Sequence, residues 1–320
     1  MKPPVLPSQF CKIHALRTTA FIAYALILYI GAAIGAGCII NSHLSVLVQL
    51  LILIPTWAIA QQGLHLLGWT GHEGFHGNLH PNREYSAMLG SFFSSLVASY
   101  LVTGYALTHW NHHNSTNKAT DPDTQIYSRY HNFWSRLLLS RFTATKKYRQ
   151  DTYRLAFSKP INLGASPLKL TTLQRLAQWN LFYAACWFAV YLVILIQWPM
   201  VGFVSIVIPH ILSANLSGLR AYIEHSGTTQ NLLQNTRSYT SPIYTLLFFG
   251  NNFHLEHHLY PYVPCYFLPS VHKWLQESGF LKDAGCLIDN SILDPWQYVF
   301  SEYQYPGGLE DQKTTLDSST

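Results

Sequence analysis

The sequence is poor in charged residues and has no paired cysteine motif. Asp, Glu, Lys and Arg make up 11% of its 320 residues, about half the share of an average soluble domain. The five cysteines are scattered, odd in number and never spaced as C-x-x-C, which argues against a disulfide framework or a zinc ribbon and suits a reducing compartment. The net charge of +5 is small and dispersed, so nucleic-acid binding is not indicated. Low charge with 14% aromatic residues indicates a membrane protein.

Four long apolar runs predict transmembrane helices, at about residues 18–40, 44–67, 179–198 and 200–219. The first run is too long and begins too far into the chain for a cleaved signal peptide. Short turns within each pair predict two hairpins. A moderately apolar segment at about 85–107 leads directly into His109. If it crossed the membrane, the histidines on either side of it would lie on opposite faces, so we expect an interfacial helix there.

The stretch between the two hairpins is basic. Residues 114–176 hold eleven Lys and Arg against three Asp, which by the positive-inside rule places this loop, both termini and the histidine clusters in the cytoplasm. The first interpretation of these charges is a solvated cytoplasmic loop. Residues 129–159 of this loop could also dock an acidic partner. We therefore expect one all-α integral membrane domain over residues 1–300, with a cytoplasmic helical cap around a di-metal site. Residues 301–320 are expected to be a disordered tail.

Sixteen histidines are the compositional outlier, and half of them fall in three tight clusters. Spacings of three and four residues place side chains on one face of a helix. Neutral imidazoles that point the same way form most of a coordination shell for a transition metal. Eight of them suit two metal ions with positions left open for a substrate such as dioxygen. These candidate ligands are His72, His76, His109, His112, His113, His254, His257 and His258.

Other interpretations account for less of the pattern. Residues 72–76 also match H-E-x-x-H, the zinc-protease motif with Glu73 as the base, but a protease needs only one further ligand and leaves both H-x-x-H-H clusters without a purpose. A haem protein would use histidines inside the spans, and a metal transporter would place ligands near the midplane. All-nitrogen ligation does not choose among iron, zinc and copper. The isolated histidines are expected to be ordinary surface or core residues: His14, His43, His131, His210 and His272.

Three motifs in this order resemble the membrane fatty acid desaturase and hydroxylase superfamily. They are H-E-G-F-H at 72–76, H-W-N-H-H at 109–113 and H-L-E-H-H at 254–258, flanked by N-S-T-N, D-P-D and L-Y-P-Y-V-P. The resemblance covers most of residues 18–275. It implies two iron ions (Fe²⁺) that use O₂ to attack an unactivated C–H bond of a lipid. A fatty acyl or lipid desaturase is the first interpretation, and a lipid or carotenoid hydroxylase or ketolase on the same scaffold is the alternative.

The resemblance also implies a ninth ligand. The family has a further histidine shortly after the fourth span, and His225 stands at that place. Acyl-CoA desaturases carry an asparagine one helical turn earlier, where this chain has Ala221. The sequence shows no dinucleotide-binding motif, iron–sulfur cysteine set or haem domain, so a separate ferredoxin or cytochrome-type electron donor is implied.

Several polar residues near the motifs are candidates for orienting the ligands. A carboxylate that accepts the N–H opposite the metal fixes an imidazole ring, although Asp121 in D-P-D equally fits turn chemistry. Glu256 would face away from the histidines on a regular helix, so we expect it to be solvated. His65, seven residues before His72, is expected to have a structural or supporting role. The remaining candidates for a supporting role are Asp121, Asp123, Glu224 and His80.

Overall fold

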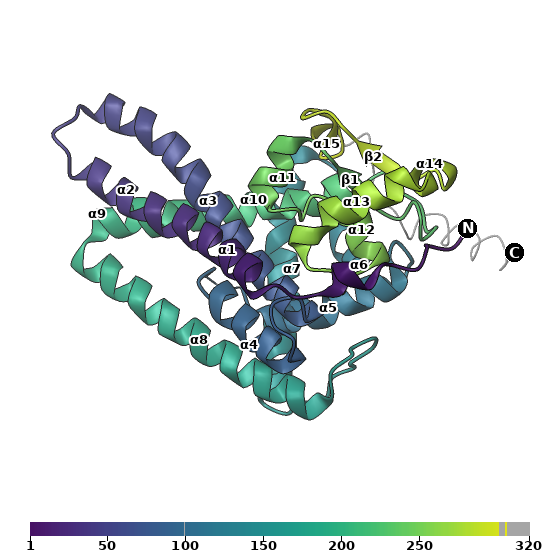
Figure 1. The fold of residues 1–320 in the computed structure, drawn as a ribbon. Coiled ribbons are helices and arrows are strands. Elements are labelled where there is room, and N and C mark those ends of the chain that lie inside the picture. The colour runs from purple at the N-terminus through teal and green to yellow at the C-terminus, as the bar shows by residue number, and fades with distance from the viewer. Residues whose placement is uncertain (99, 301–304, 306–320) are drawn as a thin grey trace, which may run out of the picture.

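The computed structural model describes residues 1–98, 100–300 and 305, and this part of the chain is mostly helical (Figure 1). Its one departure from the all-α expectation is a parallel pair of three-residue strands, β1 (Arg237–Tyr239) and β2 (Leu287–Asp289). The expected tail lies outside the described residues except for Tyr305, which is buried. Figure 1 shows long helices that extend away from a compact end where the C-terminal elements gather.

Four helices are long and apolar enough to span a membrane, as the apolar runs predict. They cover Ala15–Ile40, Val46–His76, Leu170–Gln197 and Pro199–His225. π-Helical segments at Ile27–Gly31 and Phe203–Val207 interrupt the first and fourth. The component helices are α1 (Ala15–Leu26), α2 (Ala32–Ile40), α3 (Val46–His76), α8 (Leu170–Gln197), α9 (Pro199–Gly202) and α10 (Ile208–His225).

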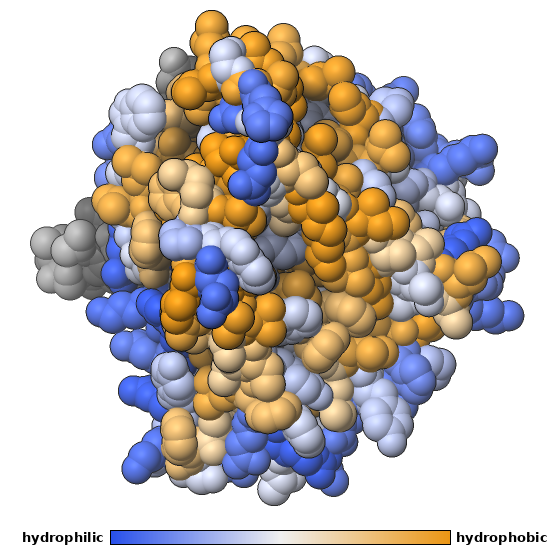
Figure 2. Space-filling model, turned by 90° about the vertical axis from the view of Figure 1, so that its left-hand side faces the viewer, coloured by the Kyte–Doolittle hydropathy of each residue, from blue (hydrophilic) through white to orange (hydrophobic). Residues whose placement is uncertain are grey.

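These helices carry many apolar side chains on their outer surfaces, over which Figure 2 shows broad orange areas. Leu47 and Leu51 on α3 are more than half exposed, as are Phe188 and Ile196 on α8. Monomeric soluble proteins rarely leave such large contiguous apolar surfaces in water. The surface therefore agrees with helices that face lipid.

Helix α3 continues nine residues beyond the predicted span and carries the first histidine pair at its end. Glycines in this extension leave room for a neighbouring helix, because a Cβ on Gly74 would lie only 2.7 Å from the Ser86 carbonyl oxygen. Helix α4 (Arg83–Ser94) can thus pack directly against α3. Gly77 ends α3 with a φ of 84°, a conformation that glycine adopts without strain.

The single interfacial helix expected at 85–107 is wrong, because the segment forms two helices. Helix α4 ends at Ser94, and α5 (Val102–Ser115) begins after a break. Side chains of α8 satisfy the backbone there: Asn180 accepts the Thr103 N–H at 3.1 Å, and the Tyr191 hydroxyl donates to the Leu96 carbonyl at 2.7 Å. Buried backbone groups need such partners, and apolar content alone did not reveal them.

The basic stretch expected to be a solvated loop also contains helices, α6 (Pro122–Tyr127) and α7 (Phe133–Ala156). A capping box between Asn132 and Ser135 starts α7, which packs against α5 and α10. Arg136 is fully buried: it donates to the Tyr298 carbonyl oxygen, and its guanidinium lies 4.6 Å from the Tyr222 ring centroid. Some of the positive charges therefore hold the fold together rather than meet solvent.

The C-terminal third covers the ends of the spanning helices. Short elements there surround α12, which carries the third histidine cluster. Leu255, Leu268, Val271 and Leu275 form its core and are fully buried. The helices of this region are α11 (Pro242–Phe248), α12 (His254–Leu259), α13 (Leu268–Glu277), α14 (Phe280–Asp283) and α15 (Asp294–Gln297).

Candidate metal centre

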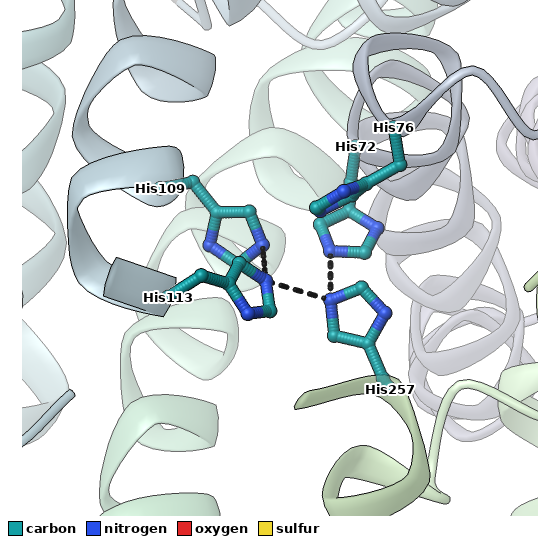
Figure 3. A group of neighbouring side chains, drawn as sticks. All are labelled: His72, His76, His109, His113 and His257. Carbon is teal, nitrogen blue, oxygen red and sulfur yellow. Dashed lines mark hydrogen bonds between the residues drawn. The ribbon is translucent and has the colours of Figure 1, made fainter. Parts of the chain in front are cut away.

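Five histidines from three helices converge at the junction of the spanning helices and the C-terminal third (Figure 3). His72 and His76 come from α3, His109 and His113 from α5, and His257 from α12. Each helical pair is spaced i, i+4, so both rings lie on one face. One nitrogen of each ring lies within 4.8 Å of those of the others. This set, which we call the first group, could hold a metal ion.

The ring nitrogens of the first group make more contacts with one another than their ring protons can satisfy. Three Nε2–Nε2 distances form a chain: His72 to His257 at 3.0 Å, His257 to His113 at 3.0 Å, and His113 to His109 at 2.9 Å. The Nε2 atoms of His257 and His113 each have two such neighbours. A ring nitrogen carries at most one proton, so one N–H must serve two contacts or one contact has no proton. Imidazoles bound at right angles, about 2.1 Å from one ion, lie about 3.0 Å apart. The residues therefore fit a shared cation.

Four more histidines converge beside the first group. His112, His225 and His258 place ring nitrogens within 4.8 Å of one another, as do His225, His254 and Glu224. The Nε2 atom of His254 lies 3.2 Å from those of both His225 and His258. This second group contains His225, as the resemblance implies. It also contains a carboxylate, since Glu224 Oε2 lies 3.3 Å from His254 Nε2.

Burial keeps most of these rings neutral. Burial, with the repulsion of neighbouring imidazoles, lowers the pKa of His109, His113, His254, His257 and His258 well below the ordinary value. A metal ligand must present an unprotonated nitrogen. These five rings are therefore already in the protonation state that metal binding requires.

Partners on the far side of four rings fix their orientation. His72 Nδ1 lies 3.1 Å from Glu73 Oε1, and His112 Nδ1 lies 2.9 Å from Asp121 Oδ2. His225 Nδ1 lies 3.0 Å from the Asn235 carbonyl oxygen. His258 Nδ1 makes a longer contact, 3.4 Å, with the hydroxyl of Thr116. When Nδ1–H donates to such an acceptor, Nε2 is left free to bind a metal.

Most of these orienting groups were not predicted from the sequence. Glu73 directly follows His72 in the sequence, and this position could have indicated an orienting role. The H-E-x-x-H motif instead suggested that Glu73 is a catalytic base. Its carboxylate accepts from His72, from the Asn78 amide at 3.3 Å and from the Cys265 backbone N–H at 2.9 Å. A carboxylate so fully engaged, against the far side of His72, cannot act as a base on a metal-bound water. A backbone carbonyl such as that of Asn235 leaves no side-chain signal at all.

The expected supporting residues have different positions. Asp121 is completely buried and performs both roles considered for it, since it accepts from His112 and caps α6. Asp123 is more distant, 3.8 Å from His112 Nδ1. Among the described residues, His80 joins neither group; its Nδ1 accepts the Asn82 N–H at 3.0 Å.

The expectation that Glu256 is solvated is wrong. Its side chain is fully buried and accepts from Ser238 Oγ at 2.5 Å and from His272 Nδ1 at 2.6 Å. It does face away from the histidine groups, but the C-terminal third packs over that side of α12. His272 is a buried, hydrogen-bonded histidine, as expected. The pair joins α12 to α13.

A cavity of about 120 Å³ borders both groups. His72 and His109 of the first group and His112, His225 and His254 of the second line it. Its other walls are polar and apolar residues of α3 and α10, the segment between α4 and α5, and polar residues of α6 and α7. A molecule in this cavity would lie directly against the metal-binding rings.

Arg220 stiffens the wall between the cavity and the second group. Its Nε donates to Glu224 at 2.5 Å, its NH1 lies 3.1 Å from His65 Nε2, and its guanidinium lies 3.8 Å from the Trp69 ring centroid. Trp69 in turn lies 4.1 Å from the His72 ring centroid. His65 thus supports the site through Arg220 and Trp69, which agrees with its expected role.

The fatty acid desaturase family model matches residues 44–288. The matched range contains all nine clustered histidines and runs from the turn before α3 to β2. No curated protein matches the chain.

Proposed function

Because the chain belongs to the fatty acid desaturase family, we propose that it is a di-iron membrane oxygenase that introduces a double bond into a lipid chain. The observation that carries the proposal is the convergence of nine histidines into two adjacent groups along one cavity. The match to a desaturase family favours desaturation over hydroxylation or ketolation. Residues 1–300 would act as one membrane domain.

We propose the nine histidines as the protein ligands of two iron ions, with five on the first ion and four on the second. Imidazole also suits zinc and copper, so the choice of iron rests on the family. Iron supplies oxygen activation and the oxidation of an unactivated C–H bond, which protein side chains cannot perform. The second group has fewer histidines than the first. The side chain of Ala221, which lines the cavity beside it, has no polar atom that could hold a water on the second ion.

The chain's own residues hold, orient and shield this centre. Asp121 and the Asn235 carbonyl hold two rings of the second group by their N–H groups. Tyr105 stacks on His109 with ring centroids 5.0 Å apart and planes inclined by 17°. Trp69 packs on His72. These aromatic walls exclude bulk water, which would otherwise compete for the open metal positions.

Electrons would come from a separate ferredoxin or cytochrome-type protein. Both termini, the site and this partner would lie in the cytoplasm, a proposal supported by the excess of Lys and Arg between the second and third spans. The four apolar helices and the family show an integral membrane protein.

Metal analysis of the purified protein tests the centre. We expect two iron ions per chain and no haem absorbance. His257→Ala removes a nitrogen with two close neighbours in the first group and should lower the iron content. His43→Ala, an exposed histidine in the turn before α3, is the matched control and should not. One zinc ion per chain that is unaffected by His257→Ala would overturn the proposal.

Lipid profiling tests the reaction. Membranes from cells that express the wild-type protein are compared with those from cells that express His257→Ala, with and without oxygen. We expect an oxygen-dependent lipid product that has lost two hydrogen atoms. A product that has gained an oxygen atom instead would replace desaturation with hydroxylation, and the absence of any change would contradict both.

A further inference from the structure

The cavity continues beyond the metal clusters into a polar chamber between α5, α6 and α7. An arginine, four tyrosines and an aspartate line this end. Residues of α3 and α10 line the rest, with small residues such as Gly68 and Ala214 beside the larger His65, Trp69 and His210. A cavity for a plain hydrocarbon chain needs no such groups, because apolar walls suffice. The polar lining residues are Tyr100, Tyr105, Asp123, Tyr127, Arg141 and Tyr148.

Arg141 is the cation of this chamber. Its guanidinium carbon lies 5.1 Å from the Tyr100 ring centroid and 5.9 Å from that of Tyr148. None of the ion pairs among the described residues involves Arg141, whereas Arg220, the other arginine of the cavity, is paired with Glu224. Arg141 hydrogen-bonds to the side chains of Tyr100 and Tyr127. A guanidinium has five N–H donors in a fixed plane, so further donors remain for an oxygen that enters the chamber.

The chamber is close to the metal-binding rings. Tyr105 stacks on His109 on one side, and its ring meets Tyr148 edge-on at 5.3 Å on the other. Tyr100 lies 5.7 Å from the same Tyr105 ring. A single tyrosine side chain therefore separates a metal-binding histidine from the rings that contact Arg141. A group held by Arg141 would lie about one side-chain length from the carbon next to the metal.

The surroundings favour a neutral oxygen over an anion. Asp123 lines the same chamber, and its carboxylate would repel a second negative charge. The tyrosines that line the chamber carry hydroxyl groups that can donate a hydrogen bond to such an oxygen. A hydroxyl or carbonyl oxygen satisfies these donors and adds no charge.

We propose that Arg141 and the surrounding tyrosines bind a hydroxyl or carbonyl oxygen of the lipid substrate, close to the carbon that is attacked. This inference rests on the proposed oxygenase function and adds the substrate class. The substrate is an oxygen-bearing lipid that enters with its polar end, while its hydrocarbon part extends between α3 and α10. The reaction then modifies a carbon near the lipid oxygen rather than the middle of a long unbranched chain.

The position of the modified carbon in the product is the first test. Fragmentation mass spectrometry of the oxygen-dependent product from wild-type membranes locates the change relative to the lipid's oxygen atoms. A change about one tyrosine length from a hydroxyl or carbonyl supports the proposal. A change in the middle of a saturated chain, remote from every oxygen, overturns it and leaves the oxygenase function standing. No oxygen-dependent product at all contradicts the oxygenase function itself.

Arg141→Met is the second test, with Arg154→Met as the control on the same helix. Arg154 is exposed and does not line the cavity. A hydrogen bond from a charged group contributes about 1.5–3 kcal/mol, so Arg141→Met should reduce product formation by about 10- to 100-fold at unchanged iron content. Arg154→Met should match the wild type. Equal product formation by wild type and Arg141→Met overturns the proposal.

A milder variant covers the case in which Arg141→Met does not fold. Tyr148→Phe removes one hydroxyl from the chamber and keeps the ring against Tyr105. It should retain iron and lower product formation severalfold. Full product formation by an iron-loaded Tyr148→Phe, together with loss of iron in Arg141→Met, would assign the chamber a structural role and overturn the binding role.

Discussion

Replacing Asp121 with asparagine separates two roles that one carboxylate combines. Its oxygens accept the His112 Nδ1–H at 3.0 and 2.9 Å, and the backbone N–H groups of Asn117 and Asp123, each at 2.8 Å. Burial lowers the pKa of His112, but the Asp121 carboxylate raises it, and the net result is a rise to about 9. Asparagine caps helices about as well as aspartate. Asp121→Asn should therefore keep the start of α6 and remove the charge that makes His112 a strong base.

The two roles differ in the size and kind of effect. Loss of a carboxylate behind a metal-binding histidine weakens metal binding or activity by about 10- to 100-fold. Asp121→Ala also removes the cap, at about 1 kcal/mol, and leaves the buried His112 N–H without a partner, at about 1–3 kcal/mol more. We expect Asp121→Asn to lose iron at lower chelator concentration while its melting temperature stays near that of the wild type. Asp121→Ala should lower both.

Asp151→Asn is the matched control. Asp151 is also a buried carboxylate, but it pairs with Lys147 on α7 at 2.5 Å and belongs to neither histidine group. Its replacement should leave iron retention unchanged. The same chelator titration curve for wild type and Asp121→Asn would refute the reasoning, as would an equal loss of iron from Asp151→Asn.

Three further predictions concern stability in detergent. Gly104→Ala should lower the melting temperature, at about 1–3 kcal/mol, because its Cβ would overlap the α7 backbone; Gly31→Ala, where a Cβ has open space, should not. His272→Ala leaves the buried Glu256 charge without its partner and should cost about 3–5 kcal/mol, so an unchanged denaturation midpoint would contradict the buried pair. Burial lowers the pKa of His109 well below 6.5, so unfolded histidines take up protons that folded ones do not. The metal-free protein should therefore lose stability as pH falls through 6.5, and a higher melting temperature at pH 5.5 than at pH 7.5 would exclude this.

The histidine clusters were predictable because their signal is local and repeated. Spacings of three and four residues place His109, His112 and His113 on one helix face, and the structure brings all three clusters together. The four spans could be located from charge and hydropathy for the same reason. Both quantities depend only on residues that are close together in the sequence. His225 has no such pattern around it and was reached only through the family resemblance.

The errors concern partners that are distant in the sequence. Nothing near Glu256 predicts that His272 and Ser238 cover it, and nothing near Arg136 predicts carbonyl oxygens more than 160 residues later as its acceptors. The break between α4 and α5 depends on Asn180 of α8. Glu256 and Arg136 were expected to be solvated because their burial comes from tertiary contacts, which composition and periodicity do not report.

The unbroken course of α3 would set the depth in the membrane at which the proposed oxidation takes place. Its 31 residues make a rod about 46 Å long, whereas the hydrocarbon core of a bilayer is about 30 Å thick. His72 and His76 occupy its last two turns. When α3 begins at the opposite face of the hydrocarbon core, these turns lie beyond that core, even with the tilt of about 20° usual for such helices. A methylene lifted to that level loses about 0.8 kcal/mol of burial unless protein receives it. In the proposed function, the cavity walls therefore have to bury whatever part of the lipid leaves the bilayer to reach the metal ions. A carbon near the polar end of the lipid would move the shortest distance out of the bilayer.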